Sequence, residues 1–539
     1  MVMTMAPAAF AADGGAQFQN GPYLLAPKTN SMVVVWESTE KVSATIAYGT
    51  DESKLCDPIK VEIDADAPDF KGSKMNLFHY KLDNLTPGTR YYYEVKLEGG
   101  ATCKASFKTL SEKPDQIRLI TLSDSHIFAT RAELDQAIKE FDPDLLLHCG
   151  DMVEGTGAQA EQFSFWFQGK VENDYIHSYP VVYSSGNHDQ GGVYFNTYVY
   201  SIQDEEYGAE VEGDSSFNYA GLHIITMNSN PWGLFQMNSE ATGQKADAAT
   251  IKTIDNAMNW LKKDLATDAA KNADFRLIFM HHPVSDAYTK RYIPAVIEPG
   301  KVDLLLSGHT HSYARAVSSN PAVGAGTIYL THQDARTYNK KGDFFYITST
   351  PGSGVLDVKN YGATAAGQES KVANETLVAK DKQQLSWSDI SITPSTVLYN
   401  GEVTVTAKVT NNGKGLAAAV IPVVDNGTTR YLYKFEDGIV TLDPGKSATL
   451  TGTLRMETLG THTLKLADKT VSVNVKYRPT TFDYTNIRTQ QGNGKTSDMN
   501  SNILHIKADV VNIGNDAGTG TAEFKVNGVT VGTRQYTLK

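Results

Sequence analysis

Five short clusters of Asp, Asn and His residues carry the chemistry that this sequence can offer. Each cluster directly follows an apolar segment of strand-like length, such as residues 117–122 or 302–306. The clusters are Asp124-Ser125-His126, Gly150-Asp151-Met152-Val153-Glu154, Gly186-Asn187-His188-Asp189, His281-His282-Pro283 and Gly308-His309-Thr310-His311. In open α/β sheets, the loops at the carboxyl ends of strands form the binding crevice. Because carboxylate, amide and imidazole groups hold borderline or hard cations, the sequence predicts a metal site built from these loops.

Each cluster taken alone has an ordinary structural explanation. Asp124 could cap a turn, Asp151 and Asn187 could form Asx-turns, and His281 or His282 could be satisfied core or surface histidines. A single His-x-His sequence such as His309-Thr310-His311 is also common in surface turns. The combination of five clusters, each at the end of a predicted strand, favours the metal site over these separate explanations.

The order of the clusters, D-x-H, G-D-x-x, G-N-H-[DE], H and G-H-x-H, resembles the calcineurin-like metallophosphoesterase superfamily. This resemblance implies a four-layer α/β/β/α sandwich and a centre of two divalent or trivalent metal ions, which could be Fe, Zn or Mn. It also implies hydrolysis of a small-molecule phosphate ester by a metal-activated hydroxide. The activity would be a phosphoric ester hydrolase.

The resemblance also assigns a role to each residue of the motifs. Asp151 would bridge the two metal ions. Asp124, His126 and His311 would complete the first site, and Asn187, His281 and His309 would complete the second. His281 is preferred to His282 because the ligand of the family is the first residue of an H-x-P arrangement. His188 would be the catalytic imidazole, oriented by Asp189.

Residues 15–112 are predicted to form a fibronectin type III-like β-sandwich. Trp36 would lie in its core, and Tyr91, after the Pro87-Gly88 turn, is placed as a tyrosine corner. A sandwich of this type in front of the motifs resembles the purple acid phosphatases, as does the sequence from Gly308 to Arg315. Two departures stand out: Glu154 occupies the place of that group's tyrosine, and His126 is present where the group lacks a histidine. We therefore expect a purple-acid-phosphatase-like architecture without the tyrosinate-to-iron absorption.

The remaining domain boundaries follow from composition and repeats. We expect a signal-peptide remnant in residues 1–14, the metallophosphoesterase domain in 115–354, and a linker in 355–384, in which 372–379 could form a short helix. The motif at 407–413 recurs at 508–514, and Asn426-Gly427 recurs as Asn527-Gly528, both at an offset of 101 residues. The repeat predicts two CARDB/Ig-like β modules, 385–477 and 478–539, the second of them incomplete.

Composition and charge limit the cellular locations and the binding partners that we expect for this protein. The net charge of −12 argues against generic nucleic-acid binding, and no run of 18 apolar residues exists that could span a membrane. Cys56 and Cys103 could form a disulfide or remain two thiols.

We expect a bacterial protein that is secreted, periplasmic or on the cell surface, where the C-terminal modules could bind a polysaccharide or protein. An acid-phosphatase-like monoesterase is the first interpretation; a phosphodiesterase and a surface binding protein are the alternatives.

Overall fold

The computed structural model describes most of the chain and divides it into two compact units. The described residues are 15–64, 69–70, 73–126, 131–155, 160–168, 174–190, 193–231, 247–284, 293–318, 326–333, 343–362, 371–380, 384–432, 440–491 and 504–539. The first unit comprises residues 1–384 with 413–418, and the second comprises 385–412 with 419–539. The expected signal-peptide remnant, residues 1–14, lies outside the described residues.

The N-terminal part of the first unit is the predicted β-sandwich. One sheet has the order β1-β2-β7, and the other has the order β4-β3-β8-β9. These strands are β1 (Phe18–Leu25), β2 (Met32–Ser38), β3 (Ala44–Gly49), β4 (Ile59–Val61), β7 (Leu77–Leu82), β8 (Arg90–Leu97) and β9 (Thr102–Lys108). Trp36 is fully buried between the sheets, and its ring stacks on Phe78 at 5.3 Å. The Tyr91 hydroxyl accepts a hydrogen bond from the Thr86 N–H, so the tyrosine corner is confirmed.

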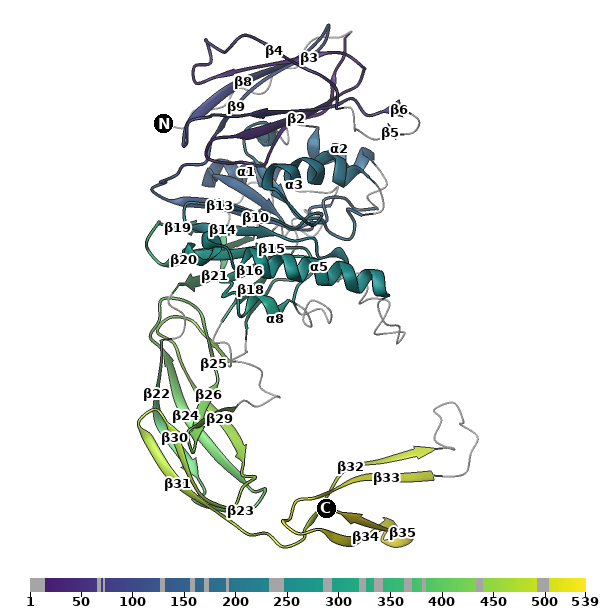
Figure 1. Cartoon of the computed structure of the whole chain (residues 1–539), viewed down its shortest axis with the longest axis vertical. Helices are drawn as coiled ribbons and strands as arrows, with labels where there is room; N and C mark the ends of the chain where they lie inside the picture. The colour runs from purple at the N-terminus through teal and green to yellow at the C-terminus, as the bar shows by residue number, and fades with distance from the viewer. Residues whose placement is uncertain are drawn as a thin grey trace. The chain divides into compact units, whose positions relative to one another are not determined.

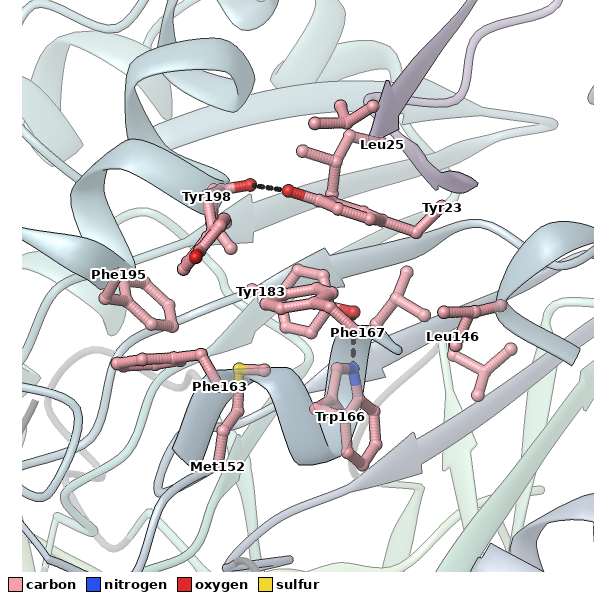
Figure 2. Close-up of a cluster of buried hydrophobic side chains, with 14 of the residues drawn as sticks. Tyr23, Leu25, Leu146, Met152, Phe163, Trp166, Phe167, Tyr183, Phe195 and Tyr198 are labelled. Atoms are coloured by element: carbon pink, nitrogen blue, oxygen red, sulfur yellow. Dashed lines mark hydrogen bonds between the residues drawn. The ribbon is translucent and has the colours of Figure 1, made fainter. Parts of the chain in front are cut away.

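Strand β2 is buried on both of its faces. Val34 and Trp36 point into the sandwich core, while Val33 and Val35 belong to a second core shared with the following domain. This double burial explains the unbroken apolar run at residues 32–36, because a strand with one solvated face would alternate. In Figure 2, Tyr23 and Leu25 of β1 lie in this shared core together with Phe163, Phe167 and Tyr198. The sandwich is thus packed onto the α/β domain through an apolar face.

The α/β domain contains two six-stranded sheets. The first has the order β12-β11-β10-β19-β20-β21 and the second the order β13-β14-β15-β16-β18-β17. The first is built from β10 (Ile117–Leu122), β11 (Leu145–His148), β12 (Val181–Tyr183), β19 (Asp343–Ser349), β20 (Val355–Gly362) and β21 (Lys371–Ala379). The second is built from β13 (Ser215–Tyr219), β14 (Leu222–Thr226), β15 (Phe275–Phe279), β16 (Leu304–Ser307), β17 (Ala314–Val317) and β18 (Ile328–Thr331). Strands β10, β11 and β12 are parallel, and so are β14, β15, β16 and β18.

Helices cover the outer face of each sheet, which gives the expected four layers. Side chains of α1 (Arg131–Phe141) and α2 (Ala160–Phe167) pack against β10 and β11. Side chains of α5 (Ala248–Asp264) and α8 (Pro294–Ile297) pack against β14, β15 and β16, and Figure 1 shows α5 running along this sheet. A third apolar core, which includes Leu147 and Leu306, fills the space between the sheets. The short helices are η1 (Asp174–His177), η2 (Asn196–Tyr200), α3 (Ser201–Tyr207) and α6 (Asp268–Asn272).

The expectation of a linker at 355–384 is wrong for most of that segment. Strand β20 pairs antiparallel with β19, and β21 pairs with β20, so both extend the first sheet. The proposed short helix at 372–379 is part of strand β21. Leu356, Val358 and Val378 are buried in the core between the sheets, while Asp357 and Lys359 point to the other face. Buried and outward-facing residues therefore alternate along these strands. The alternation was not recognised in the sequence because the segment is polar overall.

The second unit begins with a complete β module. Its sheets have the orders β22-β24-β29 and β23-β31-β30-β26-β27. The strands are β22 (Leu385–Thr393), β23 (Thr396–Leu398), β24 (Glu402–Asn411), β26 (Ile421–Asp425), β27 (Thr428–Leu432), β29 (Ser447–Arg455), β30 (Gly460–Leu466) and β31 (Lys469–Lys476). A further short strand of this unit is β28 (Val440–Leu442), while β25 (Ala417–Ala419) begins in the segment 413–418 of the first unit.

The last module consists of two strand pairs. They are β32 (Phe482–Gln491) with β33 (Leu504–Asn512), and β34 (Gly518–Val526) with β35 (Val529–Leu538), both visible in Figure 1. The repeated Asn-Gly sequences join β26 to β27 and β34 to β35, with positive φ at both residues each time. That conformation is the one a tight hairpin turn requires, so the two segments share this turn. The CARDB identity of the modules stays a prediction.

Two smaller expectations concern the cysteines and the membrane. Cys56 is exposed and Cys103 is buried, and both are free thiols, as is Cys149. The disulfide considered between the first two is therefore not formed. Among the described helices, none is long and apolar enough to cross a bilayer.

The strand assignment of residues 355–379 predicts a stability effect. Leu356→Ala removes a fully buried side chain from the core between the sheets, so it should lower the free energy of unfolding by about 2–5 kcal/mol in a denaturant titration. Lys359→Ala on the other face removes only partly exposed ion pairs with Asp357 and Glu375 and should cost at most about 1 kcal/mol. Equal effects of the two substitutions would contradict the packing.

Candidate metal centre

Every residue of the expected site follows the carboxyl end of a parallel strand. Asp124 and His126 follow β10, Asp151 follows β11, and Asn187, His188 and Asp189 follow β12. From the second sheet, His281 follows β15, and His309 and His311 follow β16. The structure brings these loops from the two sheets together at one place. The predicted convergence of these loops at the strand ends is therefore present.

The first group of ligand atoms comes from Asp124, His126, Asp151 and His311. One ligand atom of each lies within 4.8 Å of those of the other three. His311 Nε2 is 3.1 Å from Asp124 Oδ1 and 3.5 Å from His126 Nε2. All but His311 are buried. Two carboxylates and two imidazoles at these distances form a donor set that suits a transition-metal ion or zinc.

The second group is centred on His281. Its Nε2 lies 3.2 Å from Asp151 Oδ2 and 3.1 Å from Asn187 Oδ1, and its ring centroid is 5.1 Å from that of His309. Asp151 therefore reaches both groups of ligand atoms. A carboxylate shared in this way is what a bridge between two cations requires.

His282, which the sequence argument set aside, also lies in the second group. Ligand atoms of His281, His282 and His309 lie within 4.8 Å of one another. His282 is fully buried, and its Nδ1 pairs with the Ser229 hydroxyl at 2.9 Å. Burial, together with the neighbouring His281, holds the pKa of His282 well below its usual range, so its ring is neutral. Its backbone position next to His281 was the only sequence signal for this placement.

Hydrogen bonds at Nδ1 turn the Nε2 atoms of two ligand histidines toward the shared space. His281 Nδ1 donates to the Cys149 carbonyl at 2.9 Å. His126 Nδ1 lies 3.1 Å from the Val153 carbonyl and 3.1 Å from a carboxylate oxygen of Glu154. A proton fixed on Nδ1 leaves the Nε2 lone pair available to a cation. Glu154, at the position where purple acid phosphatases carry tyrosine, therefore contacts His126 directly.

The ligand loops are held in an unfavourable backbone conformation. Five residues of the expected site have positive φ, between 45° and 71°: Asp124, His126, Asp151, His309 and His311. This left-handed region costs an L-residue roughly 1–2 kcal/mol. Outliers of this kind persist only where the surroundings impose them, and they cluster at functional sites.

Two glycines allow the loops to approach this closely. A Cβ atom on Gly308 would collide with Ser123 Oγ and Asp124 Oδ2, and one on Gly186 would collide with Asp151 Oδ1. Any side chain at either position would displace an expected ligand carboxylate. The glycines of the G-H-x-H and G-N-H-D motifs are thus required by space rather than by φ.

Asp189 has a different structural role from the one expected. It is buried, and its carboxylate accepts hydrogen bonds from four main-chain N–H groups, those of Gly186, Asp151, Met152 and Val153. The expected contact with the His188 ring is not among its hydrogen bonds. Asp189 instead ties the loop after β11 to the loop after β12. The sequence could not distinguish these roles, because both place an acid next to His188.

The His188 imidazole is held by the main chain. Its Nδ1 lies 2.6 Å from the Glu154 carbonyl and 3.0 Å from the Gly155 carbonyl. Its Nε2 lies 4.0 Å from Asp151 Oδ2, and its side chain is 35% exposed. The ring therefore stands at the edge of the ligand groups with Nε2 toward them and toward solvent.

His148 is a buried residue of the site that the sequence argument did not single out. Its Nδ1 accepts the Gly150 N–H at 3.1 Å, and its Nε2 pairs with the Ser125 hydroxyl at 2.9 Å. Burial lowers its pKa to about 3, so the ring is neutral. One imidazole thus links the first two ligand loops. The only signal was a polar residue at the end of an apolar strand.

The ionisable groups at the site shift one another's pKa values. Burial alone would lower the pKa of His281, but the Asp151 and Asp124 carboxylates raise it to about 9. Burial opposes the ionisation of Asp151, yet His281 and His188 lower its pKa below the usual range. Burial lowers the pKa of His309 to about 4. Without a metal ion, one proton on His281 therefore balances part of the carboxylate charge.

Family models match two segments of the chain. Residues 117–313 match the calcineurin-like phosphoesterase model, and residues 22–109 match the model of the purple acid phosphatase N-terminal domain. The α/β domain therefore contains a calcineurin-like phosphoesterase segment, matched over residues 117–313. This family assignment covers all five clusters, from Asp124 to His311. It makes the domain a phosphoester hydrolase domain whose His and Asp residues could bind metal ions.

The solved structures to which this chain is similar are distant. A structure of PhoD is 12% identical with a TM-score of 0.48, covering 68% of this chain and 90% of PhoD. Vps29 from Entamoeba histolytica complexed with zinc is 11% identical with a TM-score of 0.26, covering 49% of this chain and all of Vps29. A protein serine/threonine phosphatase from Saccharomyces cerevisiae is 11% identical with a TM-score of 0.22, covering 48% and 82%. No curated protein matched the sequence.

The close approach at Gly308 predicts a local effect on metal binding. Gly308→Ala places a methyl group against Asp124 Oδ2 and should displace this carboxylate, weakening metal binding by about 10-fold or more in a chelator competition. Gly532→Ala is the matched control, since a Cβ there meets nothing within 4 Å. Unchanged affinity in Gly308→Ala would contradict the placement of Asp124 as a ligand.

Proposed function

We propose that the chain is an exported phosphoesterase with a centre of two metal ions, and that it acts first on phosphate monoesters. The observation that carries the proposal is the position of Asp151, whose Oδ2 is 3.2 Å from His281 in one ligand group while the residue also belongs to the other. The match of residues 22–109 to the purple acid phosphatase N-terminal domain supports the monoesterase interpretation over a diesterase.

The donor set fits two cations. The first ion would be held by Asp124, His126 and His311, and the second by Asn187, His281 and His309, with Asp151 between them. Oxygen and nitrogen ligands of this kind suit Fe, Zn or Mn. Bound cations in such a site polarise the phosphoryl group and make a water molecule acidic enough to act as nucleophile at neutral pH. The rest of the chemistry depends on side chains of this chain.

His188 is the side chain that would move a proton. The Glu154 and Gly155 carbonyls fix a proton on Nδ1, so the neutral ring has its lone pair on Nε2. When Nε2 is protonated, the imidazolium can donate to a phosphoryl oxygen or to the leaving alkoxide. Because charge spreads over the phosphoryl oxygens in a loose transition state, a cation placed there stabilises it. Asp189 contributes by fixing the two loops that carry Asp151 and His188.

The proposed location is outside the cytoplasm, on the surface or in the periplasm of a bacterium. The Ala-rich segment 1–14 and the resemblance to an exported phosphatase family support it. The C-terminal modules would bind a polysaccharide or protein there. The rates of hydrolysis of p-nitrophenyl phosphate, a monoester, and bis(p-nitrophenyl) phosphate, a diester, distinguish the monoesterase from the diesterase activity.

The roles of Asp151 and His188 predict different losses. Asp151→Ala should abolish turnover of p-nitrophenyl phosphate and lower the metal content, because both ligand groups lose an oxygen. His188→Ala should reduce turnover by about 100-fold or more and retain the metal, since general acid catalysis contributes roughly 10²–10⁴-fold. Metal analysis of each purified variant accompanies the assay. His79→Ala, on a partly exposed strand of the sandwich, is the control. Full activity of Asp151→Ala would refute the bridging role.

Metal affinity should increase with pH. His281 has a pKa of about 9 in the metal-free protein, so a cation that takes its Nε2 at pH 7 must displace a proton. The apparent dissociation constant should therefore fall by roughly tenfold per pH unit below pH 8 and level off above about pH 9. Calorimetric titrations in two buffers of different ionisation enthalpy measure the released proton. Binding at pH 7 without proton release is incompatible with ligation by His281.

A further inference from the structure

A short π-helical segment lies between the N-terminal sandwich and a ligand loop. Helix η2 (Asn196–Tyr200) continues into α3, and Tyr198 and Tyr200 are both buried. Residues two apart in a helix face nearly opposite sides, so these two side chains can contact different partners. π-helical turns are rare and occur frequently at functional sites. The contacts of the two tyrosines indicate the role of this π-helical turn.

Tyr198 is held by the sandwich. The Tyr23 hydroxyl donates to the Tyr198 carbonyl at 2.7 Å, as Figure 2 shows. The Tyr198 hydroxyl donates to a carboxylate oxygen of Glu37 at 2.9 Å, and the side-chain amide of Asn20 donates to the same oxygen at 2.6 Å. All four residues are buried. Because a buried carboxylate is costly unless hydrogen-bonded, this network fixes the position of Tyr198 tightly.

Tyr200 contacts the loop that carries Asn187 and His188. Its hydroxyl accepts the Ser185 N–H at 2.7 Å. The Ser185 hydroxyl in turn pairs with the side chains of Asn228 and Asn230. Ser185 lies two residues before Asn187, whose Oδ1 is 3.1 Å from His281 Nε2. The Tyr200 hydroxyl thus fixes the backbone at the start of the loop that leads to the second ligand group.

We propose that the N-terminal sandwich positions the second metal site through the Tyr198–Tyr200 segment. Tyr198 is fixed by Tyr23, Asn20 and Glu37. The helical backbone between Tyr198 and Tyr200 is rigid, so fixing Tyr198 also fixes Tyr200. Tyr200 in turn fixes Ser185 and the loop that follows. Tyr200 and Tyr23 are positioning residues, since neither touches the ligand atoms. The inference rests on the proposed function in that Asn187 is taken as a ligand of the second ion. It assigns the sandwich a part in the metal site beyond packing.

Among the hydrogen bonds of the described residues, none links Tyr198 or Tyr200 directly to the three residues that belong to the first site alone. Asp124, His126 and His311 belong to other loops, held by His148, the Val153 carbonyl and the His309 N–H. Loss of the Tyr200 hydroxyl should therefore act on one site more than on the other. General loss of stability would weaken both sites together. This asymmetry separates positioning from a merely structural role.

The experiment is a cobalt(II) titration of the full chain followed by visible absorption, which resolves the filling of two sites. Tyr200→Phe should weaken the second binding step about 10-fold and leave the first within about 2-fold. Tyr23→Phe removes the hydroxyl that donates to the Tyr198 carbonyl at the other end of the segment. It should also weaken the second binding step, by about 3-fold. The matched control is Tyr207→Phe on α3, whose hydroxyl contacts the Pro27 carbonyl at 3.5 Å and so lies at the same domain boundary. Equal weakening of both steps, or a change no larger than in Tyr207→Phe, overturns the proposal.

A second measurement needs no metal ion. Hydrogen exchange of the peptide covering residues 184–189 in the metal-free protein should be at least about 5-fold faster in Tyr200→Phe than in Tyr207→Phe, because the Ser185 N–H loses its acceptor. Equal exchange rates overturn the positioning role by themselves. If exchange accelerates but the wild-type chain binds no second ion, the positioning of the loop holds and the two-metal function fails. The two failures are therefore distinguishable.

Discussion

Two carboxylates buried at the strand ends determine much of the rest of this structure. Asp124 and Asp151 are almost completely inaccessible, and in the described part of the chain their charged partners are imidazoles, with no Lys or Arg ion pair to either. A buried carboxylate without a compensating charge is strongly unfavourable. Protons on histidines compensate only partly and only at suitable pH. Cations between the carboxylates would compensate at neutral pH, and the surrounding imidazoles would then serve as ligands rather than as acids.

The backbone around these carboxylates is strained, and the surroundings hold it in place. Five residues of the site have positive φ, a cost that a stability-optimised loop would avoid. The Asp189 carboxylate offsets part of it by accepting four main-chain N–H groups, and His148 links two of the loops. Violations of local backbone preference are expected at functional sites, where a ligand recovers the free energy. Glycine is required at Gly186 and Gly308 for a different reason, because a Cβ atom at either position would collide with Asp151 or Asp124.

The sequence predicted the parts of the fold that depend on local patterns. Apolar runs followed by Asp, Asn and His clusters located the parallel strands and placed the nine expected site residues after their ends, because the strand ends and the motifs are contiguous in the chain. The tyrosine corner and the Asn-Gly repeat are local in the same way. Strands β20 and β21 were missed, since only Leu356, Val358 and Val378 mark their buried face within a polar segment.

The missed features of the site depend on contacts between distant segments. Asp189 was expected to orient His188, yet three of its four main-chain partners come from the loop 36 to 38 residues earlier. The contact of Tyr198 with Glu37 spans 161 residues and leaves no periodic signal. His282 was set aside on motif position, whereas its distance from His309 depends on how two loops meet. Such contacts follow from tertiary packing, which single-sequence patterns do not encode.

Anomalous X-ray diffraction from crystals of the metal-loaded chain, collected at the absorption edge of the bound element, tests the central claim most directly. We expect two peaks, one beside Asp124, His126 and His311 and one beside Asn187, His281 and His309, with Asp151 contacting both. A single peak, or a second ion that does not contact Asp151, would contradict the shared-carboxylate centre.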